Sequence, residues 1–171
     1  LPISFARCRS QMKPKVMSQP LRIECPDHWS FGTSRTVNSL LWFINNSKVE
    51  QHALRFLARY QEKYGVELFS FVLMGNHSHI EARFPGMNRS QFYRDLNARM
   101  AEGVRYFVPE FPGGPLFARR YSEQAIVEAP DLEEYFFYCA LQPIQAGLVD
   151  RLDDYPGYNS FQDAISGKPR I

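Results

Sequence analysis

Residues 67–84 constrain the fold of this chain more than any other segment. Their sequence, ELFSFVLMGNHSHIEARF, is rich in apolar and β-prone residues on both sides of the dipeptide Gly75–Asn76. Gly and Asn tolerate the positive φ angles that tight turns between antiparallel strands need. The segment therefore predicts two strands joined by a tight turn, with an apolar face that other elements must cover.

Three helices are predicted by apolar residues at helical spacing, and each begins at a side chain that can cap an N-terminus. The first and third also carry a Glu at the capping-box position, Glu50 and Glu134. The stripe of the second helix consists of Phe92, Leu96, Met100, Val104 and Phe107. The helices are expected to begin at Ser47, Ser90 and Asp131 and to end at Gly65, before Pro109 and at Pro143.

A first strand at 28–35, weakened by Gly32, and a short strand within LFARRYSEQAIV complete the predicted elements. Helices alternating with a mostly antiparallel sheet predict an α+β fold, a sandwich of the ferredoxin-like or RRM-like type. One domain is expected over residues 17–171. Residues 1–16 are basic, contain no acid and show no periodicity, so they are predicted to form a separate arm or an upstream extension before a natural start at Met17.

Composition excludes several classes of protein. Hydrophobic residues make up 44% of the 171, yet no apolar run approaches the roughly 20 residues of a membrane span, so a cytoplasmic protein without membrane contact is expected. The three cysteines are far apart and predict neither disulfides nor a zinc site. The net charge is only +2, but residues 83–120 hold seven arginines and three acids, whereas 123–163 holds nine acids and one arginine. One face could therefore attract phosphate groups.

His77 and His79 flank Ser78 on the second strand of the predicted pair. Because side chains alternate between the two faces of a strand, both imidazoles project from one face. Two imidazoles can ligate Mn²⁺, Zn²⁺ or Fe²⁺ when a third ligand comes from elsewhere. The spacing alone is equally compatible with packed or surface histidines.

Tyr138 and Gln142 lie four residues apart on the third predicted helix and so share a face. A phenol with a pKa of about 10 is a poor nucleophile, but a metal that polarises a phosphodiester makes its attack feasible. Gln142 could lend its carbonyl oxygen to that metal. Tyr138 is equally compatible with a core position in the aromatic run YFFYCAL, and Tyr135 is a second candidate that lies nearly two turns from Gln142.

Five motifs in order carry a resemblance. FVLMGNHSHI is similar to the signature LMPNHxHL, and YCALQPIQAGLV followed by DDYPGYNS is similar to YIxxNPVxAGLVxxxxxYPxSS. PLRIECP at 20–26, TSR at 33–35 and FARRYSEQAI at 117–126 support them. Together they resemble the single-tyrosine HUH transposases, specifically the REP-associated tyrosine transposase branch, from about Met17 to Ser160.

The resemblance implies a ferredoxin-like nuclease domain in which His77, His79 and Gln142 hold Mg²⁺ or Mn²⁺. Tyr138 would attack single-stranded or hairpin DNA, leaving a 5′-phosphotyrosine link and a free 3′-OH, without ATP. The implied assembly is a monomer or a homodimer. This chain departs from the family in Ser78, where a hydrophobic residue is usual, in Gly75, Phe117 and Phe31, and in having Gln142 for the commoner Asn.

Single-stranded DNA is held by basic grooves and by aromatic rings that stack on bases. Arg119 and Arg120 are the first candidates, and if they lie on a strand only one of them faces the DNA. The full set of predicted DNA-binding residues is Arg94, Arg99, Arg105, Phe117, Arg119, Arg120 and Tyr121.

Two other functions stay open at this point. The first is a domesticated relative that binds hairpin DNA without cutting it, which Ser78 and the acidic 123–163 region favour. The second is a metal-dependent hydrolase that uses activated water, with Tyr138 in the core. A covalent protein–DNA adduct separates the transposase from both.

Overall fold

The computed structural model describes residues 24–167. The predicted basic arm at 1–16 and the start at Met17 lie outside the described residues. No helix in the described range is both long and apolar enough to cross a membrane. The strands and α-helices, in order, are β1 (Trp29–Arg35), α1 (Ser47–Tyr64), β2 (Glu67–Leu73), β3 (His77–Arg83), α2 (Arg89–Phe107), β4 (Ser122–Ile126), α3 (Ala129–Gln145) and α4 (Ser160–Ile165).

The four strands form one sheet in the order β2-β3-β1-β4. Every neighbouring pair is antiparallel. With α1 between β1 and β2, and α2 between β3 and β4, this is the β-α-β-β-α-β arrangement of ferredoxin-like folds. The predicted α+β sandwich is confirmed, and β1 and β3 form its centre.

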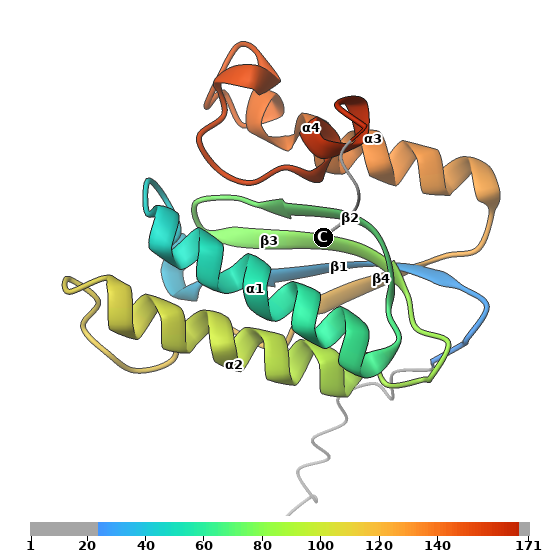
Figure 1. Cartoon of the computed structure of the whole chain (residues 1–171), viewed down its shortest axis with the longest axis horizontal. Coiled ribbons are helices and arrows are strands. Elements are labelled where there is room, and N and C mark those ends of the chain that lie inside the picture. Colours follow the sequence, from blue (N-terminus) through green and yellow to red (C-terminus); the bar gives the residue numbers. More distant parts are fainter. Residues whose placement is uncertain (1–23, 168–171) are drawn as a thin grey trace, which may run out of the picture.

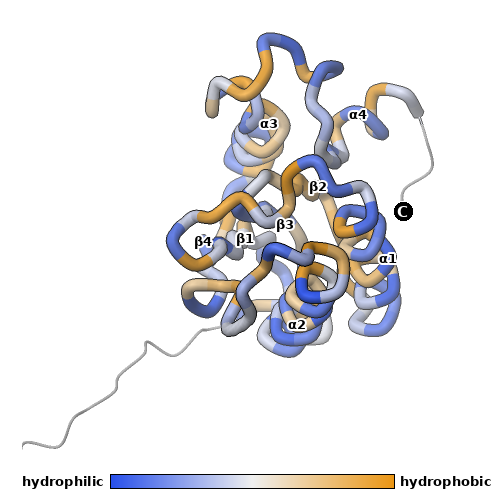
Figure 2. The backbone as a smooth tube through the Cα atoms, turned by 90° about the vertical axis from the view of Figure 1, so that its left-hand side faces the viewer, coloured by the Kyte–Doolittle hydropathy of each residue, from blue (hydrophilic) through white to orange (hydrophobic). Residues whose placement is uncertain are grey.

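Helices cover both faces of the sheet, as Figures 1 and 2 show. α1 and α2 pack against each other on one face, and α3 and α4 lie over the opposite face. The main core lies under α1 and α2, because their predicted apolar stripes turn toward the sheet. Its helical members include Val49, Ala53, Phe56, Leu57, Tyr60, Phe92, Leu96, Met100 and Val104.

The C-terminal segment, residues 155–165, holds α3 in place against the sheet. The buried side of α3, which includes Cys139, packs on β2. Asn159 is buried, and its Nδ2 donates to the carbonyl oxygen of Ala140 in α3 at 2.8 Å. The Tyr155 hydroxyl donates to the carbonyl oxygen of Leu73 at the end of β2, at 2.7 Å. These two hydrogen bonds join the segment after α3 to α3 itself and to β2, and so fix α3 over one face of the sheet.

Gly32, which weakens the strand pattern of β1, allows a close approach between layers. A Cβ atom at this position would lie 2.0 Å from the hydroxyl oxygen of Tyr93, a fully buried residue of α2. Such a separation is far inside van der Waals contact. Gly32 therefore makes room for the Tyr93 ring beneath the sheet.

Two predicted N-caps are wrong. α1 is capped by Asn46, whose Oδ1 accepts from the backbone N–H of Val49 at 3.1 Å. α2 begins at Arg89, one residue before the predicted cap Ser90. The carboxylate of Glu24, which is distant in sequence, accepts from the backbone N–H groups of both residues at 3.2 Å. A long-range contact satisfies these donors, so no local signal marks the cap.

The predicted limits of the third helix are also wrong. α3 begins at Ala129, because Pro130 fits a first helical turn, and Asp131 lies inside that turn. It continues through Pro143 to Gln145. Pro143 lacks a backbone N–H, but the helix continues because later N–H groups still have acceptors. The N–H of Ala146, for example, donates to the carbonyl oxygen of Gln142.

The tight connection expected at Gly75–Asn76 is present, since the N–H of Met74 donates to the carbonyl oxygen of His77 at 2.8 Å, but its backbone conformation differs from the expected one. Neither Gly75 nor Asn76 has a positive φ. Their carbonyl oxygens instead accept hydrogen bonds from the backbone N–H groups of Phe43 and Thr36, at 3.0 and 2.9 Å. Neighbouring loops therefore hold this connection.

Candidate active site

His77 and His79 lie on β3, on the sheet face that α3 covers. Both are buried, and their ring centroids are 4.6 Å apart. Ser78, between them, is buried and shares its parity along the strand with Ile80, a member of the core under α1 and α2. The alternation expected for this strand is confirmed, so Ser78 does not alter the direction of either imidazole.

Hydrogen bonds to Nδ1 orient both rings. Asn76 Oδ1, which can only accept, lies 2.5 Å from His77 Nδ1, so this nitrogen carries the proton and Nε2 keeps its lone pair. His79 Nδ1 lies 2.9 Å from the Thr33 hydroxyl of β1. The two Nε2 atoms are buried and have no hydrogen-bond partner among the described residues. A ring held at one nitrogen with the other unpaired is the usual arrangement of a metal-ligating histidine.

The electrostatic environment keeps both rings neutral. Burial lowers the pKa of His77 to about 4, and the positive charge of Arg35 contributes. Burial lowers the pKa of His79 to about 3, with smaller contributions from His77 and Arg35. Both imidazoles are therefore unprotonated at neutral pH, as metal coordination requires.

α3 brings Tyr138 and Gln142 to the same place. The Tyr138 ring lies 5.9 Å from the His79 ring, edge to face, and the residue is 42% exposed. Gln142 lies near enough to raise the pKa of His79, against the larger effect of burial, while its Nε2 donates to Gln145 Oε1 at 3.2 Å. The second candidate, Tyr135, instead contacts Phe31, at 5.0 Å between ring centroids. α3 thus places Tyr138 against His79 of β3, with Gln142 close to the same ring.

These donors fit a divalent cation. Two orphaned imidazole nitrogens and a nearby amide suit Mn²⁺ or Mg²⁺ when phosphate oxygens complete the coordination. Within residues 24–167 there is no group of three His, Cys, Asp or Glu side chains that could hold a metal. Any metal at the histidine pair would therefore depend on Gln142 and on the substrate.

Only some of the predicted DNA-binding residues lie close together. A cavity of about 590 Å³ lies between α2 and the segment before β4, and its lining includes Arg94, Phe117, Arg119, Arg120 and Tyr121. Arg119 and Arg120 are exposed and precede β4, so they do not lie on a strand and the alternation considered for them does not apply. Tyr121 is only 4% exposed and stacks on Tyr93 at 3.9 Å between centroids, which occupies one face of its ring.

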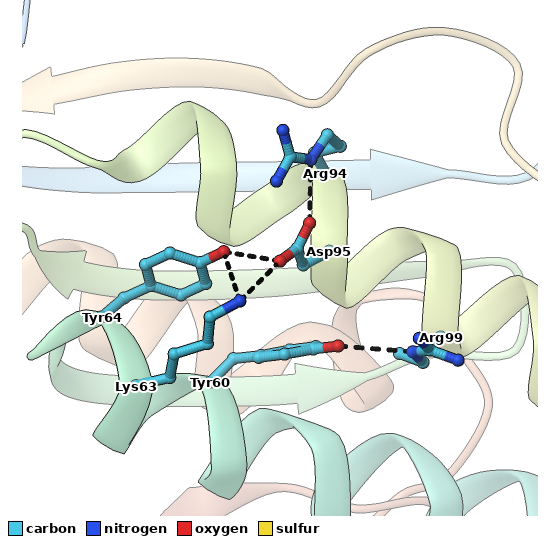
Figure 3. Close-up of polar contacts among 6 residues, drawn as sticks. All are labelled: Tyr60, Lys63, Tyr64, Arg94, Asp95 and Arg99. Atoms are coloured by element: carbon cyan, nitrogen blue, oxygen red, sulfur yellow. Dashed lines mark hydrogen bonds and ion pairs between the residues drawn. The ribbon is translucent and has the colours of Figure 1, made fainter.

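Arg99 and Arg105 lie apart from this cavity. Arg99 extends from α2 toward α1, where its Nε donates to the Tyr60 hydroxyl at 3.3 Å (Figure 3). It also forms an ion pair with Glu102. Arg105 donates to the carbonyl oxygen of Gly114 at 3.1 Å. Arg94 borders the cavity but forms an ion pair with Asp95 at 2.8 Å, a contact drawn in Figure 3.

Sequence reasoning missed the residues that surround the histidines. Phe31 of β1 stacks on His79 at 5.0 Å and also contacts Tyr138 at 5.7 Å. Thr33 pairs with His79 in the β1–β3 register. The available signals were the TSR motif and the Asn76 that precedes His77. Neither could be placed without the register of the two strands.

Glu81 continues the row of His77 and His79 on β3 and is fully buried. Burial raises its pKa to about 7, although Ser70 Oγ donates to Oε2 at 3.0 Å. Its Oε1 has no partner among the described residues. Because the folded state binds the Glu81 proton more tightly than the unfolded state does, protonation of Glu81 contributes to the free energy of unfolding. This contribution is full below about pH 4.5 and is lost as the pH rises through 7.

Replacing Glu81 with Gln is therefore expected to stabilise the protein at pH 8 by about 2 kcal/mol, with little effect at pH 5. Urea unfolding in EDTA at both pH values measures the difference. Glu62→Gln, which changes an exposed carboxylate on α1, is the matched control. Equal stabilisation at the two pH values would show that Glu81 does not titrate as described.

Comparison with known proteins supports the fold. No protein-family model matches the sequence, and no curated protein matches it. A solved structure of a REP-associated tyrosine transposase bound to a REP hairpin aligns with 90% of this chain and 89% of its own, at a TM-score of 0.72 and 18% identity. A protein of Deinococcus radiodurans R1 provisionally assigned as a transposase covers 71% of this chain and 95% of its own, at a TM-score of 0.47 and 14% identity. The chain thus has the fold of the REP-associated tyrosine transposase.

Proposed function

We propose that this chain is a metal-dependent endonuclease and strand transferase of the REP-associated tyrosine transposase type, acting on single-stranded DNA beside hairpins. The observation that carries the proposal is the position of Tyr138 and Gln142 of α3 beside two buried histidines with unpaired Nε2 atoms. The REP hairpin bound by the protein with the same fold suggests the class of DNA.

His77, His79 and the carbonyl oxygen of Gln142 would hold Mg²⁺ or Mn²⁺. Once bound, the metal would withdraw charge from the scissile phosphate. Asn76 and Thr33 fix the imidazoles by their Nδ1 atoms, so little reorganisation precedes binding.

The nucleophile would be the hydroxyl of Tyr138. Its oxygen forms a bond to phosphorus and loses its proton to solvent, while the bond from phosphorus to the 3′ oxygen breaks and that oxygen takes up a proton. The products are a 5′-phosphotyrosine and a free 3′-OH. Attack by a 3′-OH on the phosphotyrosine reverses these steps, so rejoining needs no ATP.

The segment before β4 is the proposed contact for the DNA backbone. Arg119 and Arg120 are exposed there, beside the cavity lined by Phe117. Exposed arginines bind phosphates and aromatic rings stack on bases. Since Arg99 and Arg105 are turned elsewhere, the proposal concerns this segment first.

Arg119→Ala and Arg120→Ala are each expected to weaken binding of a single-stranded hairpin oligonucleotide by about threefold to tenfold at 0.1 M salt. The slope of log K against log salt should become shallower by about one unit for each phosphate that the variant no longer neutralises. Fluorescence anisotropy over a salt series measures both quantities. Arg59→Ala, on the exposed side of α1, is the control, and unchanged affinity in both variants would contradict the assignment.

The test of the function is a covalent adduct. The protein is incubated with Mn²⁺ and labelled hairpin oligonucleotides that carry single-stranded flanks, with duplexes as controls, and resolved on a denaturing gel. A slow band with the hairpins supports the transferase. Hairpin binding without an adduct or a nick would instead identify a domesticated binder, and cleavage without an adduct a hydrolase that uses water.

A further inference from the structure

Arg35 stands at the end of β1 next to the histidine pair. In the β1–β3 register its Cα pairs with that of His77, and its side chain is exposed. Alternate residues of a strand share a face, so Arg35 projects from the same face as Phe31 and Thr33, which contact His79. The guanidinium therefore belongs to the face that carries the candidate metal ligands.

Among the residues that the structure describes, no acid balances the charge of Arg35. Its side chain forms no ion pair and no hydrogen bond with any residue in the range 24–167. Its positive field reaches the site of both imidazoles, since it projects from the same face and its Cα pairs with that of His77. The same field must raise the free energy of a divalent cation bound at the two Nε2 atoms. An arginine in this position weakens metal binding unless an anion accompanies the metal.

The backbone of Arg35 is joined to the segment proposed to bind DNA. Its carbonyl oxygen accepts from the backbone N–H of Ala118 at 3.0 Å, and the next residue, Thr36, forms a single β-bridge with Phe117. Arg35 thus lies between the exposed pair Arg119 and Arg120 and the histidines. A DNA strand that follows this segment toward α3 brings its phosphates to the Arg35 guanidinium.

We infer that Arg35 binds the phosphate that enters the site and thereby makes metal binding depend on DNA. This inference rests on the proposed function, because it requires a metal at the histidine pair. In the free protein Arg35 disfavours the metal. With DNA bound, the phosphate neutralises Arg35 and contributes oxygens to the metal, so each ligand strengthens the binding of the other by the same factor.

The test measures Mn²⁺ affinity by the EPR signal of free Mn²⁺, using the full chain with Tyr138→Phe so that DNA stays uncut. Arg35→Gln is expected to tighten Mn²⁺ binding about threefold to tenfold without DNA at low salt, and high salt should reduce this gain. Saturating hairpin DNA should strengthen Mn²⁺ binding at least tenfold with Arg35 present and far less in Arg35→Gln. Arg35→Lys, which keeps the charge, should resemble the parent without DNA.

Arg59→Gln on α1 makes the same change of charge on the other side of the sheet and should leave the Mn²⁺ affinity unchanged. If Arg35→Gln binds Mn²⁺ as the parent does, with and without DNA, the inference is overturned while the metal site stands. If the parent binds no Mn²⁺ even with DNA, the proposed function fails first, and the inference fails with it.

Discussion

Tyr138→Phe is expected to abolish the covalent protein–DNA adduct, lowering its rate of formation by at least about 1000-fold, because no other group can replace a missing nucleophile. Folding should change little. The residue is partly exposed, and its hydroxyl forms no hydrogen bond within the described residues 24–167. Hairpin affinity should stay within about threefold of the parent, since a single hydroxyl is removed. A denaturing gel and anisotropy on the same preparations measure the two effects.

Tyr135→Phe is the matched control. It removes a hydroxyl from the same helix, three residues earlier, where the ring packs on Phe31. The adduct should persist in this variant. Loss of the adduct in Tyr135→Phe and its survival in Tyr138→Phe would reverse the assignment of the nucleophile.

The second large effect is expected at His79. His79→Ala should weaken Mn²⁺ binding by at least about 100-fold, because a direct ligand is lost rather than a supporting group. Adduct formation should fall with it. Isothermal titration with Mn²⁺ in the presence of uncut hairpin DNA measures the affinity, and urea unfolding in EDTA shows how much stability the loss of the stacked ring costs.

A graded control comes from Thr33→Val, which removes only the hydrogen bond to His79 Nδ1. Loss of such an orienting partner should weaken the binding of Mn²⁺ about tenfold. If His79→Ala binds Mn²⁺ as tightly as the parent, the two histidines are packed side chains and the proposed metal site is absent.

Local patterns in the sequence were sufficient for much of the fold. The apolar stripe from Phe92 to Val104 faces the sheet as expected, since period and burial are linked in any packed helix. The spacing of His77 and His79, and that of Tyr138 and Gln142, placed each pair on one face. What joined the two pairs was the resemblance, because periodicity carries no information on which helix covers which strand.

The errors and omissions have a common physical cause. Glu24 caps α2 and Thr33 orients His79, and each acts across more than forty residues of sequence. The helical spacing of Arg99 is that of a surface arginine, but because α1 packs beside α2, Arg99 donates to the hydroxyl of Tyr60. Tyr121 looks like a stacking residue until Tyr93 covers its ring. Such contacts depend on register and layer packing, which local propensity does not encode.

The C-terminal segment also protects an edge of the sheet. β2 is an outer strand, and its free backbone groups would offer a template to another chain. The N–H of Leu73 donates instead to the carbonyl oxygen of Tyr158, and that of Phe71 to the hydroxyl of Ser160, each at 3.0 Å. The residues that hold α3 against the sheet therefore also occupy hydrogen-bonding groups at the edge of β2. This opposes aggregation through that edge. Protein lacking residues 155–167 would be prone to pair edge to edge with copies of itself.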